Sequence, residues 1–324
     1  MGVKGHRAGQ ERRLLRAVLL LFLAAALTAS PSAGSEYLGD FDVTLLSLKV
    51  NARGEALISY RKTNGARRDV VVRGAMNARA PDPQRPQVKF ELDYSGGWRM
   101  HGSASYARSF RNRCRPYDGP ALVLLVAACK APDGSYWALQ SWQRLAPMRG
   151  FEPFLPRHSA RELHVSHWSG PLPQLEVSPN WTYGASLQGL FGRLRYLGEP
   201  VYGFRTPSAT RNDPYARFVY IDTFNSVYGP GWKRDTAIVT HVRNGAFCYS
   251  FVAQAPPPGY PSRQPRGPGN GERHRVTVMG PGVTPIVRWE GKGLYRYDAT
   301  ADQVFNKRFD ELVGPDDRVC VPER

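Results

Sequence analysis

The sequence lacks the short motifs that mark the commonest catalytic and nucleotide-binding folds. It contains no Walker loop, no HExxH, no G-x-S-x-G and no dinucleotide-binding glycine fingerprint. It has no CxxC pair, and His241 and Cys248, its nearest histidine and cysteine in sequence, match no familiar ligand spacing. The sequence therefore predicts no cofactor and no metal site, and no motif supports an enzymatic activity.

Long apolar runs are also scarce, and the one present lies near the N-terminus. Residues 17–29 form an apolar run of 13 residues, too short for a membrane span but suited to the core of a secretory signal. The basic residues before it are Lys4, Arg7, Arg12, Arg13 and Arg16. We expect residues 1–33 to be a signal peptide and the remaining chain to be secreted or extracytoplasmic, in the cell envelope, without a transmembrane span. An uncleaved anchor helix is the alternative.

Cysteine is rare, with only Cys114, Cys129, Cys248 and Cys320. An even number of cysteines in an exported chain favours disulfide bonds. We expect the pairs Cys114–Cys129 and Cys248–Cys320, because each pair then lies within one half of the chain. A metal site is the alternative, and oxidation of all four cysteines would exclude a thiol nucleophile.

Lysine is scarce, with 8 residues against 36 arginines. The formal net charge is +17, of which residues 1–33 contribute +4, so the expected mature chain carries +13. Such a charge attracts anionic polymers and surfaces. The arginines are scattered, and a bias toward arginine is typical of a GC-rich genome. We therefore expect a general attraction to anionic cell-wall polymers or lipid surfaces, and no specific nucleic-acid site.

Alternation of apolar and polar residues between turn signals predicts a mainly β fold. In the first half, strands are expected at residues 41–50, 56–61, 69–73, 88–94, 122–129, 135–145, 163–168 and 174–178. The continuously apolar run at 122–129 favours a strand buried on both faces. We predict two packed antiparallel β regions, sandwich- or barrel-like and disulfide-stapled, with few short helices, at residues 34–187 and 188–324.

Residues 214–252 carry the densest chemistry of the chain. Strands are expected at 217–224, 236–242 and 247–252, and three such strands in sequence predict an antiparallel meander. Glycine and proline between the first two strands predict a loop. The candidate ligand-binding residues of this loop are Tyr228, Trp232, Lys233, Arg234 and Asp235, because rings stack on sugar faces and cations bind anions. The alternative is a tight loop whose rings cap the core.

Carboxylates offer a second hypothesis, since glycoside hydrolysis needs two carboxyl groups about 5–10 Å apart. The candidates for a cross-strand pair are Asp222, Asp235, Glu176 and Glu290. Two same-strand pairs, Asp40 with Asp42 and Glu91 with Asp93, have a suitable spacing. Each of these two pairs lies opposite an apolar face, so we expect a solvated outer edge in both cases.

Three histidines are candidates for a metal site or a catalytic role. His164 and His167 are three apart, so on a strand they point to opposite faces and cannot share a metal ion. His241 has no identifiable aspartate or serine partner, and we expect it to be a partly buried structural histidine.

The runs YIDTFNSVYGPGWKRD (220–235), VTHVRNGAFCYSF (239–251) and GERHRVTVMGPGVTPIVRWEG (271–291) resemble an uncharacterised family of exported proteins from GC-rich bacteria. The resemblance implies export and no particular activity. The leading hypothesis is a monomeric, non-enzymatic binding or envelope-associated protein that contacts glycans or anionic cell-wall polymers. The alternative is a polysaccharide or peptidoglycan hydrolase with a cross-strand carboxylate pair, and a third possibility is a structural accessory protein without a small ligand.

Overall fold

A computed structural model describes residues 35–74, 90–143, 160–183, 187–201, 219–226, 229–236, 246–250, 271–280 and 284–292. By its internal contacts the chain divides into the units Met1–Pro31 and Ser32–Arg324, and all described residues belong to the second unit. These residues form antiparallel sheets with two short helices, so the predicted mainly β fold is confirmed. None of the helices among them is long and apolar enough to cross a membrane.

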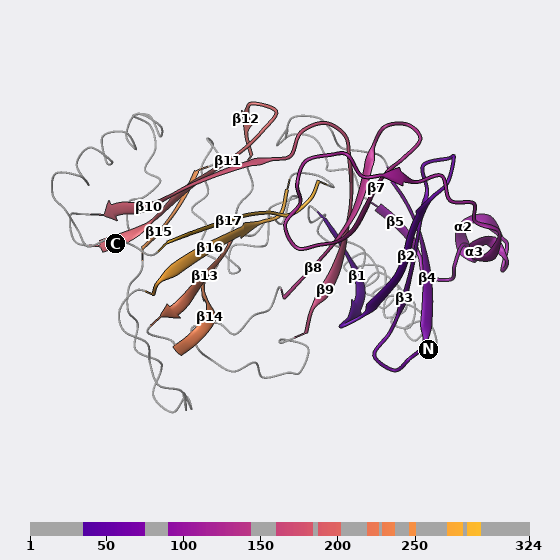
Figure 1. Cartoon of the computed structure of the whole chain (residues 1–324), viewed down its shortest axis with the longest axis horizontal. Helices are drawn as coiled ribbons and strands as arrows, with labels where there is room; N and C mark the ends of the chain where they lie inside the picture. Colours follow the sequence, from indigo (N-terminus) through magenta and orange to yellow (C-terminus); the bar gives the residue numbers. More distant parts are fainter. Residues whose placement is uncertain are drawn as a thin grey trace, which may run out of the picture. The chain divides into compact units, whose positions relative to one another are not determined.

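Two sheets make up the first β region. Sheet A has the strand order β1-β9-β8-β7-β6, with bounds Glu36–Phe41, Glu162–Trp168, Tyr136–Trp142, Leu125–Lys130 and Arg115–Pro116. Sheet B has the order β2-β3-β4-β5, with bounds Thr44–Val50, Ala56–Arg61, Arg67–Gly74 and Phe90–Asp93. Figure 1 shows the strands of each sheet side by side.

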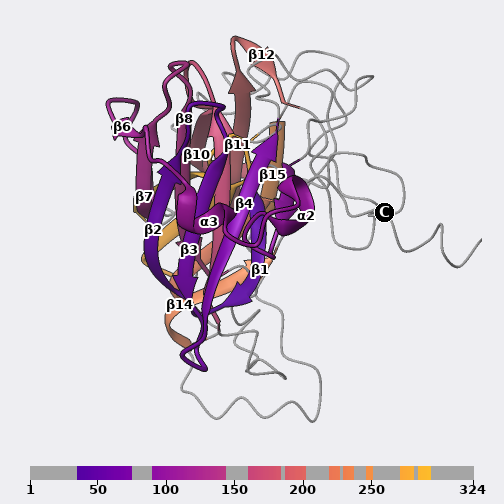
Figure 2. The same ribbon diagram turned by 90° about the vertical axis from the view of Figure 1, so that its right-hand side faces the viewer.

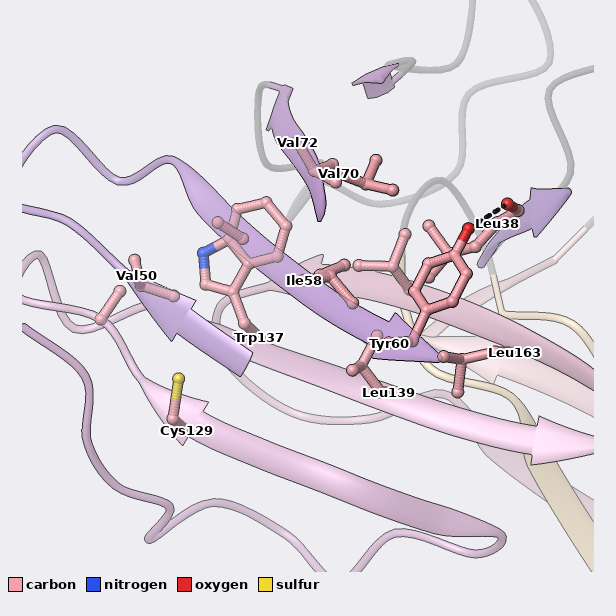
Figure 3. Close-up of a cluster of buried hydrophobic side chains, with 13 residues drawn as sticks. Leu38, Val50, Ile58, Tyr60, Val70, Val72, Cys129, Trp137, Leu139 and Leu163 are labelled. Carbon is pink, nitrogen blue, oxygen red and sulfur yellow. Dashed lines mark hydrogen bonds between the residues drawn. The ribbon is translucent and has the colours of Figure 1, made fainter. Parts of the chain in front are cut away.

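The core of this region forms where sheets A and B bury their apolar faces against each other. Alternate residues of a strand point to the same face, so Ile58 and Tyr60 of β3 enter the core together. Figure 3 shows them with Trp137 and Leu139 of β8. All four side chains are fully buried. This packing confirms that the first region is a sandwich of two antiparallel sheets.

Strand β7 is less buried than its sequence predicts. Leu125 and Val126 are both 44% exposed, although the run 122–129 was expected to be covered on both faces. Only one neighbour, β8, continues the sheet along the whole of β7, since β6 on its other side is two residues long. The strand therefore lies near a sheet edge, where a continuous apolar run does not require burial on both faces.

The predicted disulfide Cys114–Cys129 is present. It links the segment that follows the helices α2 (Trp98–His101) and α3 (Tyr106–Ser109) to strand β7. Figure 2 shows the two helices close together beside sheet B. The other expected pair, Cys248–Cys320, lies outside the described residues, since the structure describes neither the side chain of Cys248 nor Cys320.

The second β region also consists of two sheets. Sheet C has the order β14-β13-β16-β17, with bounds Gly229–Thr236, Val219–Ser226, Arg273–Val278 and Val287–Lys292. Sheet D contains β10, β11, β12 and β15, with bounds Gln174–Tyr183, Leu187–Tyr196, Glu199–Pro200 and Ala246–Ser250. Their shared core includes Leu190, Leu194, Tyr196, Val219, Ile221, Phe247, Val276 and Val278. The second region therefore also consists of packed antiparallel sheets.

We expected the boundary between the two β regions at residue 187. The pairing of the described strands changes earlier in the chain. Residue 187 begins β11, which pairs with β10 from Gln174 to Tyr183. A boundary at 187 would therefore cut a hairpin. Strands up to β9 pair only with one another, and so do strands from β10 onward. The break in pairing falls between Trp168 and Gln174.

The loop expected within residues 214–252 is wrong, because it is mostly strand: β14 runs from Gly229 to Thr236 and pairs with β13. Gly231 has a positive φ of 75°, and the register of this pair shifts twice, so glycine and proline here accompany an irregular strand. The third strand of the expected meander is β15, which pairs with β11 of sheet D. The meander itself stays a prediction, because its middle strand is mostly not described. The strand expected at 236–242 lies mainly outside the described residues, as does His241.

Two buried histidines predict that acid weakens the fold. Burial lowers the pKa of His167 to about 4, against the opposing charge of Asp133, and burial likewise lowers the pKa of His274 to about 4. The unfolded chain then binds more protons than the folded chain between pH 4 and 6.5. We expect the free energy of unfolding to fall by up to about 3 kcal/mol per histidine as the pH drops through this window.

Urea unfolding at several pH values from 7.5 to 4 measures this dependence. The variants His167→Gln and His274→Gln should each reduce the slope of the free energy of unfolding against pH, because one fewer proton is taken up on unfolding. If either variant keeps the wild-type slope, that histidine is not held neutral by the fold.

Candidate functional site

The outer face of sheet C carries the residues with the most suggestive chemistry. In β13, Val219 and Ile221 lie in the core between sheets C and D. Side chains alternate along a strand, so Asp222 and Phe224 belong to the opposite face. In β16, Val276 and Val278 face the same core, which places Arg273 and Arg275 on the opposite face as well.

The antiparallel register aligns these outer residues in two rows across the four strands. The first, which we call the ring row, is Trp232, Phe224, Arg273 and Lys292. The second, which we call the charged row, is Arg234, Asp222, Arg275 and Glu290. Directly opposed side chains lie about 4.5–5.5 Å apart at Cβ, so each row is a line of neighbours. The charged row alternates in sign, whereas the ring row has two cations and no carboxylate.

Aromatic rings hold the arginines of β16 in place. The guanidinium carbon of Arg275 lies 3.7 Å from the centre of the Trp232 ring. That of Arg273 lies 4.7 Å from the Phe224 ring and 5.4 Å from the Trp232 ring. A cation over an aromatic face is attracted by about 0.5–1 kcal/mol at exposed sites. One face of Trp232 is thus covered by a guanidinium, and the ring positions the cation.

Three guanidinium groups share one carboxylate on this face. Glu290 lies 3.5 Å from Arg273, 3.3 Å from Arg275 and 4.0 Å from Arg288. Burial lowers the pKa of the Arg288 guanidinium, and the charge of Arg275 acts in the same direction. The side chains of Arg273 and Glu290 are 47% and 31% exposed, and those of Arg275 and Arg288 are 21% and 22% exposed. The cluster therefore has excess positive charge that solvent, or a ligand, can reach.

The pair Asp222–Arg234 is buried and has a structural role. Nε of Arg234 donates to Asp222 at 2.8 Å and its Nη2 donates to the second carboxylate oxygen at 3.4 Å. The two side chains are only 9% and 3% exposed, and Arg234 also lies over the Tyr220 ring at 4.5 Å. Arg234 is therefore a structural cation that fixes the β13–β14 hairpin.

The structure brings two of the five predicted ligand-binding residues onto one face. Trp232 and Arg234 belong to the two outer rows, while Lys233 lies between them in sequence and is buried on the opposite face. Tyr228 and the side chain of Asp235 lie outside the described residues. The ligand-binding role of these residues stays a prediction.

Sequence reasoning missed Phe224, Arg273, Arg275 and Arg288, and it considered Glu290 only as a catalytic carboxylate. Their signal is the alternation of RHRVTV at 273–278, in which Arg273 and Arg275 share a parity opposite to Val276 and Val278. That alternation gives a face, but only the pairing of β16 with β13 brings the arginines beside Trp232.

The histidines of β9 are structural, and they lie on a strand as predicted. His164 contacts Glu162 at 2.8 Å and Ser35 at 3.3 Å, all three being buried. His167 contacts Ser135 at 3.0 Å. Among the described residues, no group of three or more His, Cys, Asp or Glu side chains is arranged to hold a metal ion.

The same-strand carboxylate pairs are only partly solvated. Asp93 is 1% exposed, so its expected position on a solvated edge is wrong. It accepts from the amides of Ser95 and Met100, and these bonds order the turn before α2. Its neighbour Glu91 is exposed and pairs with Arg73 at 2.7 Å.

Asp40 and Asp42 line an open cavity of about 320 Å³ together with Gly39, Phe41, Lys62, Thr63 and Ala160. Asp40 accepts from Tyr60 at 2.7 Å and from Arg68 at 2.8 Å, and Lys62 is 3.1 Å away. These contacts lower the pKa of Asp40 although burial acts to raise it. Asp40 therefore anchors neighbouring strands and is not poised as a proton donor.

Comparison of the chain with family models, with curated proteins and with solved structures gave no match. The arrangement of residues on sheet C is therefore the basis for any functional inference.

The buried pair predicts a strong dependence of stability on Asp222. Asp222→Asn removes the carboxylate that pairs with the buried Arg234, which should cost about 3–5 kcal/mol of unfolding free energy. The double variant Asp222→Val/Arg234→Met removes both charges and should recover most of that loss. Urea unfolding measures both effects.

Glu91→Gln is the matched control, because it breaks the exposed pair with Arg73 and should cost at most about 1 kcal/mol. A cost for Asp222→Asn no larger than that of Glu91→Gln would contradict a structural role for the buried pair.

Proposed function

We propose that this chain is an exported, non-enzymatic binding protein whose sheet C outer face contacts an anionic cell-wall polymer. The observation that supports it is the sharing of Glu290 by Arg273, Arg275 and Arg288 beside the ring row. Arginine forms paired hydrogen bonds with phosphate or carboxylate groups. A polymer that carries such groups at intervals would supply the counter-charge that one glutamate does not provide.

The geometry favours an anionic group over a neutral sugar as the recognised feature. A sugar stacks on an open ring face, and Arg275 lies 3.7 Å over one face of the Trp232 ring, so that face presents a cation in place of a sugar platform. The rings hold the guanidinium groups in fixed positions, which lowers the conformational entropy lost on binding. The glycan part of the hypothesis is therefore narrowed to glycans that carry acidic groups.

The alternative hydrolase would depend on Asp222 and Glu290, the candidate carboxylates that share the charged row. They lie two strand spacings apart, about 10 Å. Each already contacts guanidinium groups, and a general acid must instead carry a proton. Glu176 is on β10 in another sheet, and the side chain of Asp235 lies outside the described residues. No described contact favours this alternative over binding.

Binding of linear polyphosphate, polygalacturonate and neutral dextran tests the proposal. We expect the two polyanions to bind in a salt-sensitive manner and dextran not to bind. Arg273→Gln/Arg275→Gln should weaken polyanion binding by roughly 30-fold or more, because hydrogen bonds to charged groups contribute about 1.5–3 kcal/mol each. Glu290→Gln should strengthen it, because the variant frees three guanidinium groups and removes a repulsive charge.

Arg67→Gln/Arg73→Gln is the matched control, with the same change in net charge on sheet B, where both arginines are exposed and ion-paired. Equal weakening by the two double variants would show that polyanions respond to net charge alone and would refute a site on sheet C. Weaker binding by Glu290→Gln would show that the carboxylate takes part in the site.

Export itself is part of the proposal and has its own test. The supporting observations are the basic and apolar pattern of residues 1–33 and the Cys114–Cys129 disulfide, since disulfides persist in oxidising compartments. We expect the chain recovered from the cell envelope or the medium to start near residue 34, as N-terminal sequencing would show. Recovery of the intact chain from the cytoplasm, with a reduced Cys114–Cys129 pair, would refute export.

A further inference from the structure

Residues 94–113 form a second basic surface, far in sequence from sheet C. The segment contains four arginines, Arg99, Arg108, Arg111 and Arg113, and no aspartate or glutamate. It also contains Trp98, which is 56% exposed. We call Trp98 and these four arginines the helical patch, because the helices α2 and α3 lie within the segment (Figures 1 and 2).

The backbone that carries the helical patch is fixed to sheet B. Tyr106 of α3 donates to the buried carboxylate of Glu55, and Nη2 of Arg53 donates to the Tyr106 hydroxyl at 2.8 Å. Burial acts to raise the pKa of Glu55, but the hydrogen bonds from Tyr106 and Asn51 keep it lowered, so the carboxylate stays ionised. These contacts join α3 to the turn between β2 and β3.

Close packing of the two helical turns adds to this rigidity. A Cβ at Gly97 would come within 2.4 Å of the Tyr106 ring, so a residue with a side chain cannot occupy this position without a shift. Gly97 also has a φ of 104°, which glycine adopts without strain. The turn that precedes Trp98 is therefore held in one conformation.

The end of the segment is tied down in the same way. The side-chain oxygen of Asn112 accepts from the amides of Val50 and Cys114, both at 3.0 Å, and the Cys114–Cys129 disulfide follows. Arg111 and Arg113, on either side of Asn112, are exposed. The segment is therefore an ordered support for exposed cations.

The charges of the helical patch have no counter-charge among the described residues. Arg99, Arg108, Arg111 and Arg113 are all exposed, and none forms an ion pair with a described carboxylate. By contrast, the exposed Arg67 and Arg73 of sheet B pair with Asp69 and Glu91. These exposed cations thus share one segment of the chain with Trp98, the most exposed of the described tryptophans.

We propose that the helical patch docks the protein on an anionic lipid bilayer. Tryptophan prefers the membrane interface, where its ring meets acyl chains and its N–H meets water. Arginines near an anionic leaflet add about 1 kcal/mol each by charge attraction. A bilayer is favoured over a soluble polymer because Trp98 is exposed to solvent and, among the described residues, no guanidinium covers its ring, unlike that of Trp232.

Charge attraction and one inserted ring give reversible binding, so the patch would hold the protein at a membrane surface without spanning it. The inference is independent of the proposed polymer site, because it uses residues of the first β region only. Contact with a membrane through the first region would leave sheet C for a polymer ligand.

Partitioning of the full chain onto vesicles tests the inference. The probe is a set of phosphatidylcholine vesicles with and without 30% phosphatidylglycerol, and sedimentation measures the bound fraction. We expect binding that requires the anionic lipid and weakens with salt. Arg111→Gln/Arg113→Gln should reduce the partition coefficient by roughly 30-fold. Trp98→Gln should also weaken binding, and Trp98→Phe should abolish most of the fluorescence quenching by brominated lipid.

The double variant Arg67→Gln/Arg73→Gln has the same charge change and serves as the control, so it should bind vesicles nearly as well as the wild type. Residues 17–29 are common to all variants, so insertion of that run cannot produce a difference between them. Equal losses in the two double variants would refute the patch, as would undiminished quenching in Trp98→Phe. A loss of polyphosphate binding, but not of vesicle binding, in Arg111→Gln/Arg113→Gln would assign the patch to a polymer instead.

Discussion

The burial of one face of each sheet against a partner sheet determines every other feature of this protein. Side chains alternate with a period of two, so a slip of one residue would move a whole strand's apolar set into solvent. In sheet C, Val219 and Ile221 of β13 and Val276 and Val278 of β16 hold the register against sheet D. The same constraint places Asp222, Phe224, Arg273 and Arg275 on the outer face. The candidate site is therefore a consequence of core packing, and its residues need no interaction of their own to be brought together.

Charges on that face differ in function because they differ in access to water. The Asp222–Arg234 pair is nearly removed from solvent, and its attraction serves to offset the cost of burying both ions. Glu290 and the arginines around it are more exposed, so their interactions are weaker and can be exchanged for contacts with another anion. One face of a sheet can thus contain a fixed ion pair and, next to it, a cluster whose ionic contacts can be exchanged.

Local patterns in the sequence predicted the features that depend on residues close together in the chain. Alternation and turn residues located β3 at 56–61 and β9 at 163–168 closely, and the placement of the cysteines within one half of the chain gave the Cys114–Cys129 pair.

Which strands pair with which could not be predicted in this way. The return strand at 247–252 pairs with β11, which lies far earlier in the chain, and its Phe247 enters the core between sheets C and D. Glycine and proline at 229–231 hid β14, since an edge strand tolerates proline and irregular pairing. Trp232 was found because it is aromatic, and its partners Arg273 and Arg275 were missed because they lie about 40 residues away in the chain and meet it only through the sheet.

The distribution of arginines gives the high net charge a structural meaning. A charge of +17 spread evenly over a surface attracts every anion alike, and salt screens this attraction. Here Arg67, Arg73 and Arg234 are matched by carboxylates on their own sheets, and Arg68 of sheet B is matched by Asp40 of sheet A. Their charge is largely cancelled at contact distance, so they add little to a local field. Two groups of the remaining cations lie on ordered backbone, beside Glu290 on sheet C and along residues 94–113. Because cations on a fixed backbone meet an anionic surface in a fixed arrangement, these two groups convert a general attraction into preferred orientations. Ordered excess charge, more than the total charge, is what the fold contributes to recognition.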